Sequence, residues 1–342
     1  MASISKTPDV TYVLRGESPR HFSIERVFSD VAGHVGQTRP VEEIQLPASG
    51  VRPDRLLRNL GAASKIRGDI IHLTGDAHYV LLAIGRSSRR VVTVHDLNRY
   101  AQLTGLKRKA YRALWIWPLR RADAITCVSE FARQQLVQAD PALSSRTQVV
   151  ENPVSEVFVA DPDMASIPRH VVAIGTAPNK NLEATISACA AIDEVTLTVV
   201  GAMTGAQKAL AAKVGVTATE RTGISDEELA DLYRSAAVVS FPSTAEGFGL
   251  PIIEAQACGV PVVTSDIAPL NEVANGGALL VDPMDHEALA TALERAMKRE
   301  SDVEELIAAG RRNAEERSAA SVAHQYNEVY HRVTTRSVEL DA

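Results

Sequence analysis

A chain of 342 residues exceeds the size of one ordinary hydrophobic core, so its length favours two domains. With 45% hydrophobic and 23% charged residues it has the composition of a globular protein, which excludes the disordered and fibrous classes. Residues 1–150 hold 22 of the 36 Lys and Arg residues but only 13 of the 42 Asp and Glu residues, so this half is basic and the remainder is acidic. A basic half attracts an anionic partner such as a membrane surface, a lipid-linked phosphate or a nucleic acid.

The cysteines and the N-terminus indicate a compartment. Cys127, Cys189 and Cys258 are far apart and odd in number, which favours neither a disulfide framework nor a zinc site and fits a reducing cytoplasm. The first residues, MASISKTPDV, lack the apolar core of a secretory signal, and no stretch reaches the roughly 20 apolar residues of a membrane span. We therefore expect a cytoplasmic protein that is neither secreted nor integral to a membrane.

Two series of short, β-branched runs, each run followed by a helical segment, predict repeated βα units with parallel sheets. The first series predicts strands at 10–14, 69–73, 91–95, 124–128 and 147–151. The second predicts strands at 170–175, 195–201, 236–242, 260–265 and 278–283, with helices such as 226–235 and 286–299 between them. The polar, proline-containing stretch 161–170 is the candidate linker, and the chain after residue 301 is predicted to be helical.

The segment 241–266, FPSTAEGFGLPIIEAQACGVPVVTSD, carries the most chemical information. A predicted buried strand ends in a loop of small residues, and Pro251 suits the first turn of the helix that follows. Glycines let a backbone approach a ligand, a helix N-terminus attracts a diphosphate, and a carboxylate beside it accepts the hydroxyls of a ribose or sugar diol. The loop and first helical turn supply these groups through Glu246, Gly247, Phe248, Gly249, Leu250 and Glu254. The segment therefore predicts a nucleotide-sugar site.

The Glu246-x7-Glu254 spacing around GFGLP closely resembles the signature of the retaining GT-B glycosyltransferases of family four (glycosyltransferases group 1). Residues 222–243, 174–188 and 270–283 are similar to that family's lead-in, phosphate-side motif and continuation, so the resemblance covers nearly all of 170–300. It implies an α/β fold of two Rossmann-like domains with parallel sheets facing a central cleft. We expect an acceptor domain over 1–160, a nucleotide-sugar domain over 168–320, and a C-terminal helix over 321–342 that crosses back to the first domain.

The resemblance also implies roles for single residues in the second domain. Glu254 would hold the donor ribose, Glu246 and the backbone from Phe248 to Leu250 would grip the transferred sugar, and Lys180 would neutralise the diphosphate. Relatives usually carry an arginine directly after the glycine that corresponds to Gly175. This chain has Thr176 there, so the sequence predicts a different grip on the phosphates.

In the first half, the candidate residues follow predicted strand ends, where a parallel sheet presents groups to a ligand. His95 closes the strand at 91–95, and the resemblance implies a histidine near the donor sugar. Asp76 and His78 are candidates for the acceptor site, with a purely structural role as the stronger alternative. Arg15 joins them as an acceptor candidate; it begins the segment Arg15–Glu17, where relatives have a glycine-rich loop and this chain has one glycine.

These residues imply a retaining, metal-independent hexosyltransferase that moves a sugar from a nucleoside-diphosphate sugar to a bacterial-type cell-surface glycan or lipid-linked precursor. His95 and Glu246 are its catalytic candidates. No acidic cluster of the DxD type follows a predicted strand, and we expect no metal site and no cofactor beyond the substrate. Two alternatives stay open: a degenerate transferase-like binding subunit, which the loss of arginine at Thr176 favours, and a nucleotide-sugar epimerase on the same fold.

Residues 106–123, LKRKAYRALWIWPLRRAD, combine six basic side chains with Trp115 and Trp117. One interpretation is peripheral contact with the inner face of a membrane. The stronger alternative is an ordinary helix of the fold whose tryptophans lie in the core. No nucleic-acid-binding motif accompanies the charge, so we expect no nucleic-acid partner.

Overall fold

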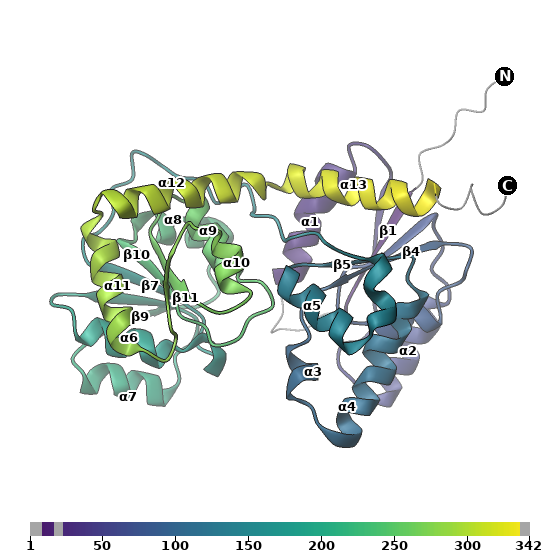
Figure 1. The fold of residues 1–342 in the computed structure, drawn as a ribbon, viewed down its shortest axis with the longest axis horizontal. Helices are drawn as coiled ribbons and strands as arrows, with labels where there is room; N and C mark the ends of the chain where they lie inside the picture. Colours follow the sequence, from purple (N-terminus) through teal and green to yellow (C-terminus); the bar gives the residue numbers. More distant parts are fainter. Residues whose placement is uncertain (1–8, 17–22, 336–342) are drawn as a thin grey trace. The chain divides into compact units, whose positions relative to one another are not determined.

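The structure, a computed structural model, describes residues 9–16 and 23–335, which form two compact units (Figure 1). One unit comprises the chain up to Pro153 together with the C-terminal part from Ala319, and the other comprises Val154–Ser318. Each unit contains one six-stranded sheet in which every neighbouring pair of strands is parallel. The prediction of parallel sheets in α/β domains is thereby confirmed. Among the described residues, no helix is long and apolar enough to cross a membrane.

The sheet of the first unit has the strand order β2-β1-β3-β4-β5-β6. Its strands are β1 (Val10–Leu14), β2 (Val41–Gln45), β3 (Ile70–Leu73), β4 (Arg89–Val94), β5 (Ala124–Cys127) and β6 (Thr147–Val149). The unit's helical elements are α1 (Ser23–Val35), α2 (Pro53–Ala63), η1 (His78–Leu82), α3 (Asn98–Gln102), α4 (Gly105–Tyr111), the π-helix η2 (Arg112–Ile116), η3 (Trp117–Arg121), α5 (Glu130–Ala139), η4 (Pro141–Arg146) and α13 (Ala319–Thr335). All five strands expected in this half form, whereas β2 escaped prediction because the edge segment VEEIQ is mostly exposed and lacks an apolar run.

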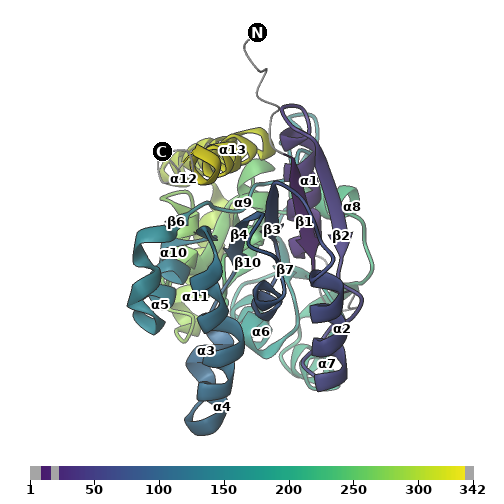
Figure 2. The ribbon, with the colours of Figure 1, turned by 90° about the vertical axis from the view of Figure 1, so that its right-hand side faces the viewer.

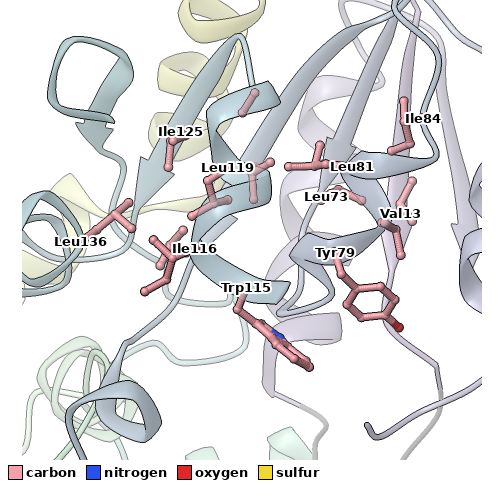
Figure 3. Packing of buried hydrophobic residues seen from close by; sticks show 14 of the residues in the cluster. Val13, Leu73, Tyr79, Leu81, Ile84, Trp115, Ile116, Leu119, Ile125 and Leu136 are labelled. Carbon is pink, nitrogen blue, oxygen red and sulfur yellow. The ribbon is translucent and has the colours of Figure 1, made fainter. Parts of the chain in front are cut away.

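One face of this sheet packs on an apolar core (Figure 3). Alternate strand residues such as Val13, Leu73 and Ile125 point to this face, as the two-residue period of a strand requires. The covering helices contribute buried side chains that include Leu81, Ile116, Leu119 and Leu136. Trp115 belongs to this core, whereas Trp117 is 53% exposed, so the two tryptophans of the basic segment have different environments.

The opposite face carries α13, which packs against α1 and β4 (Figure 1). Strand residues on this face are polar or aromatic, and they hydrogen-bond to the helix. His72 Nδ1 lies 2.7 Å from the Tyr330 hydroxyl and His72 Nε2 lies 2.8 Å from Thr93 Oγ1. The Tyr330 hydroxyl in turn donates to that of Tyr12 at 3.1 Å. Burial lowers the pKa of His72 to about 3, so this imidazole is neutral and acts as a fixed bridge between β3 and α13.

The sheet of the second unit has the order β12-β11-β10-β7-β8-β9. Its strands are β7 (His170–Ile174), β8 (Thr196–Val200), β9 (Thr217–Arg221), β10 (Val238–Phe241), β11 (Val262–Ser265) and β12 (Leu279–Val281). Its helices are η5 (Pro178–Lys180), α6 (Leu182–Ala190), α7 (Gly205–Lys213), α8 (Asp226–Ser235), α9 (Leu250–Ala257), α10 (Leu270–Ala274), α11 (His286–Lys298) and α12 (Ser301–Glu316). The five predicted strands form here too, and the missed strand is again an exposed edge, β9.

The stretch predicted as a linker, residues 161–170, lies inside the second unit. The segment before it is held by Arg234 on α8, whose Nε donates to the Val159 carbonyl at 2.8 Å, and the backbone N–H of Ile167 donates to Ser235 at 2.8 Å. The unit's first and last residues, Val154 and Ser318, form a parallel β-bridge. The chain therefore enters and leaves this unit at one point.

Candidate nucleotide-sugar site

The candidate site lies at the carboxyl ends of β7 and β10 in the second unit. These two strands are neighbours, with Val238 beside Val171, although 63 residues of chain separate the end of β7 from the start of β10. From β7 the chain continues through α6 to β8 on one side, and from β10 it continues through α9 to β11 on the other. Such a reversal of strand order opens a crevice outside the strand ends, which is where open α/β sheets bind their ligands.

Lys180 reaches this strand edge because of the glycine that follows β7. Gly175 has φ +88°, and a Cβ on it would lie 2.8 Å from Lys180 Cγ, so only glycine lets the lysine fold back over the loop. The next residue, Asn181, adopts a left-handed conformation and donates from its side chain to the carbonyls of Pro242 and Pro283. The loop after β7 is thereby tied to the loops after β10 and β12.

Lys180 and Glu246 form an ion pair, with 2.6 Å between Nζ and Oε1. Their side chains are 22% and 14% exposed, so the pair is shielded yet open to solvent on one side. The amide of Asn179 donates to the Ala245 carbonyl at 2.9 Å and holds the same loop, and Lys180 Nζ lies 4.7 Å from the ring centroid of Phe241. The structure thus brings the phosphate-side motif and the first signature glutamate together.

The signature loop turns into α9 at Gly249, whose φ is +115°. A Cβ there would lie 2.8 Å from Leu270 Cδ2, so both the backbone angle and the packing require glycine. Phe248 is buried beside it. The helix begins at Leu250 with Pro251 in its first two positions, as predicted. The first N–H groups of α9 therefore point out at the carboxyl edge of the sheet.

Glu254 differs from its prediction in one respect. It lies in the second turn of α9, because the helix begins one residue before Pro251 and has Leu250 as its first residue. Its side chain is also buried, with 3% exposed, and Oε2 accepts a hydrogen bond from the hydroxyl of Tyr233 at 3.1 Å. Sequence reasoning missed Tyr233, because a tyrosine in the apolar stripe of α8 has the pattern of an ordinary core residue.

Thr176 occupies the position where the resemblance implies an arginine. Its carbonyl accepts a hydrogen bond from Nε2 of Gln207 at 3.1 Å, and Gln207 also bonds to Glu183 at 3.0 Å. A Cβ on Gly201 would lie 3.2 Å from the Thr176 methyl group, so the threonine packs closely on the end of β8. Here the loop is braced by a buried amide from α7 that the sequence pattern did not reveal.

In the first unit, His95 follows β4 and its Nε2 lies 2.7 Å from the Thr74 carbonyl. A carbonyl only accepts, so Nε2 carries the proton of this bond. Burial lowers the pKa of His95, which favours the neutral ring. The remaining nitrogen, Nδ1, then carries a lone pair and is an acceptor.

Two acceptor candidates of the first unit, Asp76 and His78, contact the π-helix η2. His78 Nδ1 donates to the Trp115 carbonyl at 2.8 Å, and Trp115 Nε1 donates to the Asp76 carbonyl at 2.5 Å. His78 Nε2 is buried and has no hydrogen-bond partner among the described residues, and burial lowers the pKa of this histidine. The Arg15 side chain packs against Gly75, 3.3 Å from the position of a Cβ there.

The one glycine after β1 has a structural reason. A Cβ on Gly16 would lie 2.3 Å from the Ala48 carbonyl carbon, so this glycine admits a crossing chain. Glu17 lies outside the described residues. Within the described ranges, no group of three or more His, Cys, Asp or Glu side chains has the geometry of a metal site.

Comparison with known proteins assigns the chain to a family. Residues 168–299 match the model of the glycosyl transferases group 1, and residues 8–157 match that of Glycosyltransferase Family 4. The chain belongs to glycosyltransferase family 4, as the signature predicted. Solved structures show the GT-B fold. Sucrose-phosphate synthase from Thermosynechococcus elongatus superposes with a TM-score of 0.79 at 17% identity, over 96% of this chain and 100% of that one.

A second similar structure is HepE of Anabaena in complex with UDP and glucose, with a TM-score of 0.76 at 17% identity over 95% of this chain and 100% of that one. Among curated proteins, the chain is 42% identical to O-antigen chain mannosyltransferase B of Escherichia coli over 78 residues, 23% of this chain and 20% of the relative. It is 40% identical to the MMP alpha-(1->4)-mannosyltransferase of Mycolicibacterium hassiacum over 138 residues, 39% of this chain and 34% of the relative. The chain thus spans about a fifth to a third of the length of these two relatives.

Proposed function

We propose that this protein transfers a hexose from a nucleoside-diphosphate sugar to an acceptor hydroxyl, with retention of the anomeric configuration and without a metal ion. The observation that carries the proposal is the contact between Lys180 and Glu246, because it joins a cation to a sugar-binding carboxylate at the reversal of strand order. Family membership and the α9 N-terminus beside this pair support the same reading.

Each donor group has a proposed partner in the second unit. The diphosphate lies at the N–H groups that begin α9 and accepts a hydrogen bond from Lys180. Lys180 gives up its contact with Glu246 to make this bond. Glu246 and the backbone from Phe248 to Leu250 bind the hydroxyls of the sugar, and Glu254 binds those of the ribose. Gly175 and Thr176 line the phosphate side. Preorganised donors aimed at the phosphates supply the largest electrostatic stabilisation of the transition state.

In the reaction, the bond between the anomeric carbon and the β-phosphate oxygen breaks, and its electron pair leaves on the phosphate. The acceptor oxygen attacks from the face the phosphate leaves, and its proton passes to the departing phosphate. Glu246 is a binding group and not a nucleophile in this scheme, because the acceptor oxygen attacks the anomeric carbon directly. His95 contributes a neutral Nδ1 that accepts a hydroxyl hydrogen, and Asp76, His78 and Arg15 bind the acceptor.

The relatives support a choice of substrates to test. Both curated relatives are mannosyltransferases, and one acts on an O-antigen chain, which supports mannose as the sugar and a cell-surface polysaccharide or its lipid-linked precursor as the acceptor. HepE was solved with UDP and glucose, which supports UDP-glucose as the second donor to test. These substrates remain proposals for this chain.

Contact with the inner face of an anionic membrane is part of the proposal. Helix α4, which is labelled in Figure 2, has no buried residue. Its Leu106 is 83% exposed, and it carries Lys107, Arg108 and Lys109. Basic side chains around an exposed apolar one favour an anionic lipid surface. The protein should float with vesicles of phosphatidylglycerol and not with phosphatidylcholine alone. Binding that persists when Leu106→Ser is combined with Lys107→Glu and Lys109→Glu would remove α4 from this role.

A thermal-shift screen of the purified chain tests the function. Wild type and Glu254→Ala are heated with UDP, GDP, ADP, CDP, dTDP and their common sugars. A ligand at a hundredfold excess over Kd stabilises the native state by about 2.7 kcal/mol, so a true donor stands out. We expect one nucleotide to raise the Tm of wild type alone, and transfer of its sugar to follow. A shift without turnover would support a degenerate binding subunit, and interconversion of free nucleotide sugars would support an epimerase.

A further inference from the structure

The carboxylate of Glu254 is buried in the second unit and held by a phenol. Its side chain is 3% exposed, and Oε2 lies 3.1 Å from the Tyr233 hydroxyl, which donates the hydrogen bond. A buried carboxylate loses its contacts with water, so its hydrogen-bond donors decide where it points. Glu254 has several rotatable bonds, and a donor on one oxygen restricts all of them. The Tyr233 hydroxyl therefore helps set the direction of the second oxygen.

Tyr233 is itself fixed in place. Its side chain is fully buried, and its ring lies 6.0 Å from that of Phe158 at an angle of 53°. Helix α8, which carries it, begins with a capping box in which Ser225 and Glu228 bond to each other's backbone N–H groups. Helices α8 and α9 pack together, and Tyr233 and Glu254 face each other across this contact. The phenol is thus a preorganised donor on a rigid support.

We propose that Tyr233 is a positioning residue that gives the site its preference for nucleotides with ribose hydroxyls. It acts through Glu254 and touches no ligand itself. This inference rests on the proposed function, in which Glu254 binds the ribose. A carboxylate held in one orientation accepts from a diol without first losing rotamer freedom, so the phenol strengthens binding only when the hydroxyls are present. The phosphate and base contacts do not depend on it.

Calorimetric titration of the full-length protein tests this role. The probes are UDP and GDP, each compared with its 2′,3′-dideoxy form, and the variants are Tyr233→Phe and Glu254→Gln. In wild type, loss of the ribose hydroxyls should weaken binding of the preferred nucleotide at least tenfold. Tyr233→Phe should raise the Kd of that nucleotide about tenfold and leave the Kd of its dideoxy form within twofold of the wild-type value. In the Glu254→Gln background, Tyr233→Phe should have no further effect on either ligand.

The matched control is Tyr326→Phe, which removes another buried phenol, bonded to Thr93 in the first unit, and should change neither affinity. Equal weakening of the ribose and dideoxy forms by Tyr233→Phe would make Tyr233 a general support of the fold and overturn the inference, as would unchanged affinity for both. If Glu254→Gln leaves the ribose preference of wild type intact, the ribose role of Glu254 fails first. If none of the five nucleoside diphosphates of the thermal screen binds wild type, the proposed donor site fails and the inference falls with it.

Discussion

The ion pair between Lys180 and Glu246 gives the most specific prediction, because substitutions of its two partners should have different effects on the binding of a nucleoside diphosphate. With 2.6 Å between Nζ and Oε1, the Coulomb attraction is about 6 kcal/mol at an effective dielectric constant of 20. Desolvation of two largely buried groups offsets most of that attraction. We therefore expect a coupling of about 1–2 kcal/mol in a double-mutant cycle of Lys180→Met and Glu246→Gln, measured by urea unfolding.

Nucleotide binding should separate the two partners. If the diphosphate competes with Glu246 for the ammonium group of Lys180, Lys180→Met removes a charge-assisted hydrogen bond to the phosphate. The affinity for the nucleoside diphosphate should then fall by roughly 10-fold to 100-fold. Glu246→Gln releases the lysine and should leave the Kd of the diphosphate unchanged or lower, while transfer of the sugar falls because a sugar contact is lost. Titration with the diphosphate and a turnover assay with its sugar measure the two effects.

One outcome would refute this reasoning. If Glu246→Gln weakens binding of the nucleoside diphosphate as strongly as Lys180→Met does, Lys180 does not exchange Glu246 for phosphate. The pair is then a structural contact of the loop. Additive effects on the free energy of unfolding, within about 0.5 kcal/mol, would likewise show that the contact contributes nothing to stability.

Two further predictions concern stability. Gly249→Ala should destabilise the protein by about 2–4 kcal/mol, because alanine disfavours φ +115° and its Cβ meets Leu270, whereas Gly205→Ala, with nothing within 4 Å, should change the urea midpoint little. His72 has a folded pKa of about 3 against about 6.5 unfolded, so below pH 6.5 the unfolded state binds one more proton and the free energy of unfolding falls by about 1.4 kcal/mol per pH unit. Between pH 5 and 6.5, the free energy of unfolding should change less steeply with pH in His72→Asn than in wild type, because the variant lacks this titrating group. An unchanged slope would contradict the burial of a neutral imidazole.

Local patterns in the sequence carry much of this fold. Buried parallel strands such as β7 and β10 are continuous apolar runs, and α8 has the periodicity and caps of a helix, so both could be predicted without a structure. The glycines and proline of the signature loop likewise report local backbone needs, as Gly249 shows. The edge strands β2 and β9 escaped because an exposed strand needs no apolar residues.

Contacts between distant segments were decided by the tertiary structure alone. The sequence identified Lys180 and Glu246 separately, but the order of strands in the sheet brings them to 2.6 Å. It gave no sign that Tyr233 donates to Glu254, that Gln207 braces Thr176, or that Tyr330 on α13 meets His72 on β3. A helix or strand depends largely on interactions within a few residues, so the residue types of that segment are enough to predict it. A pair of side chains across an α/β unit depends on the packing of every element between them, and that information exists only in the folded chain.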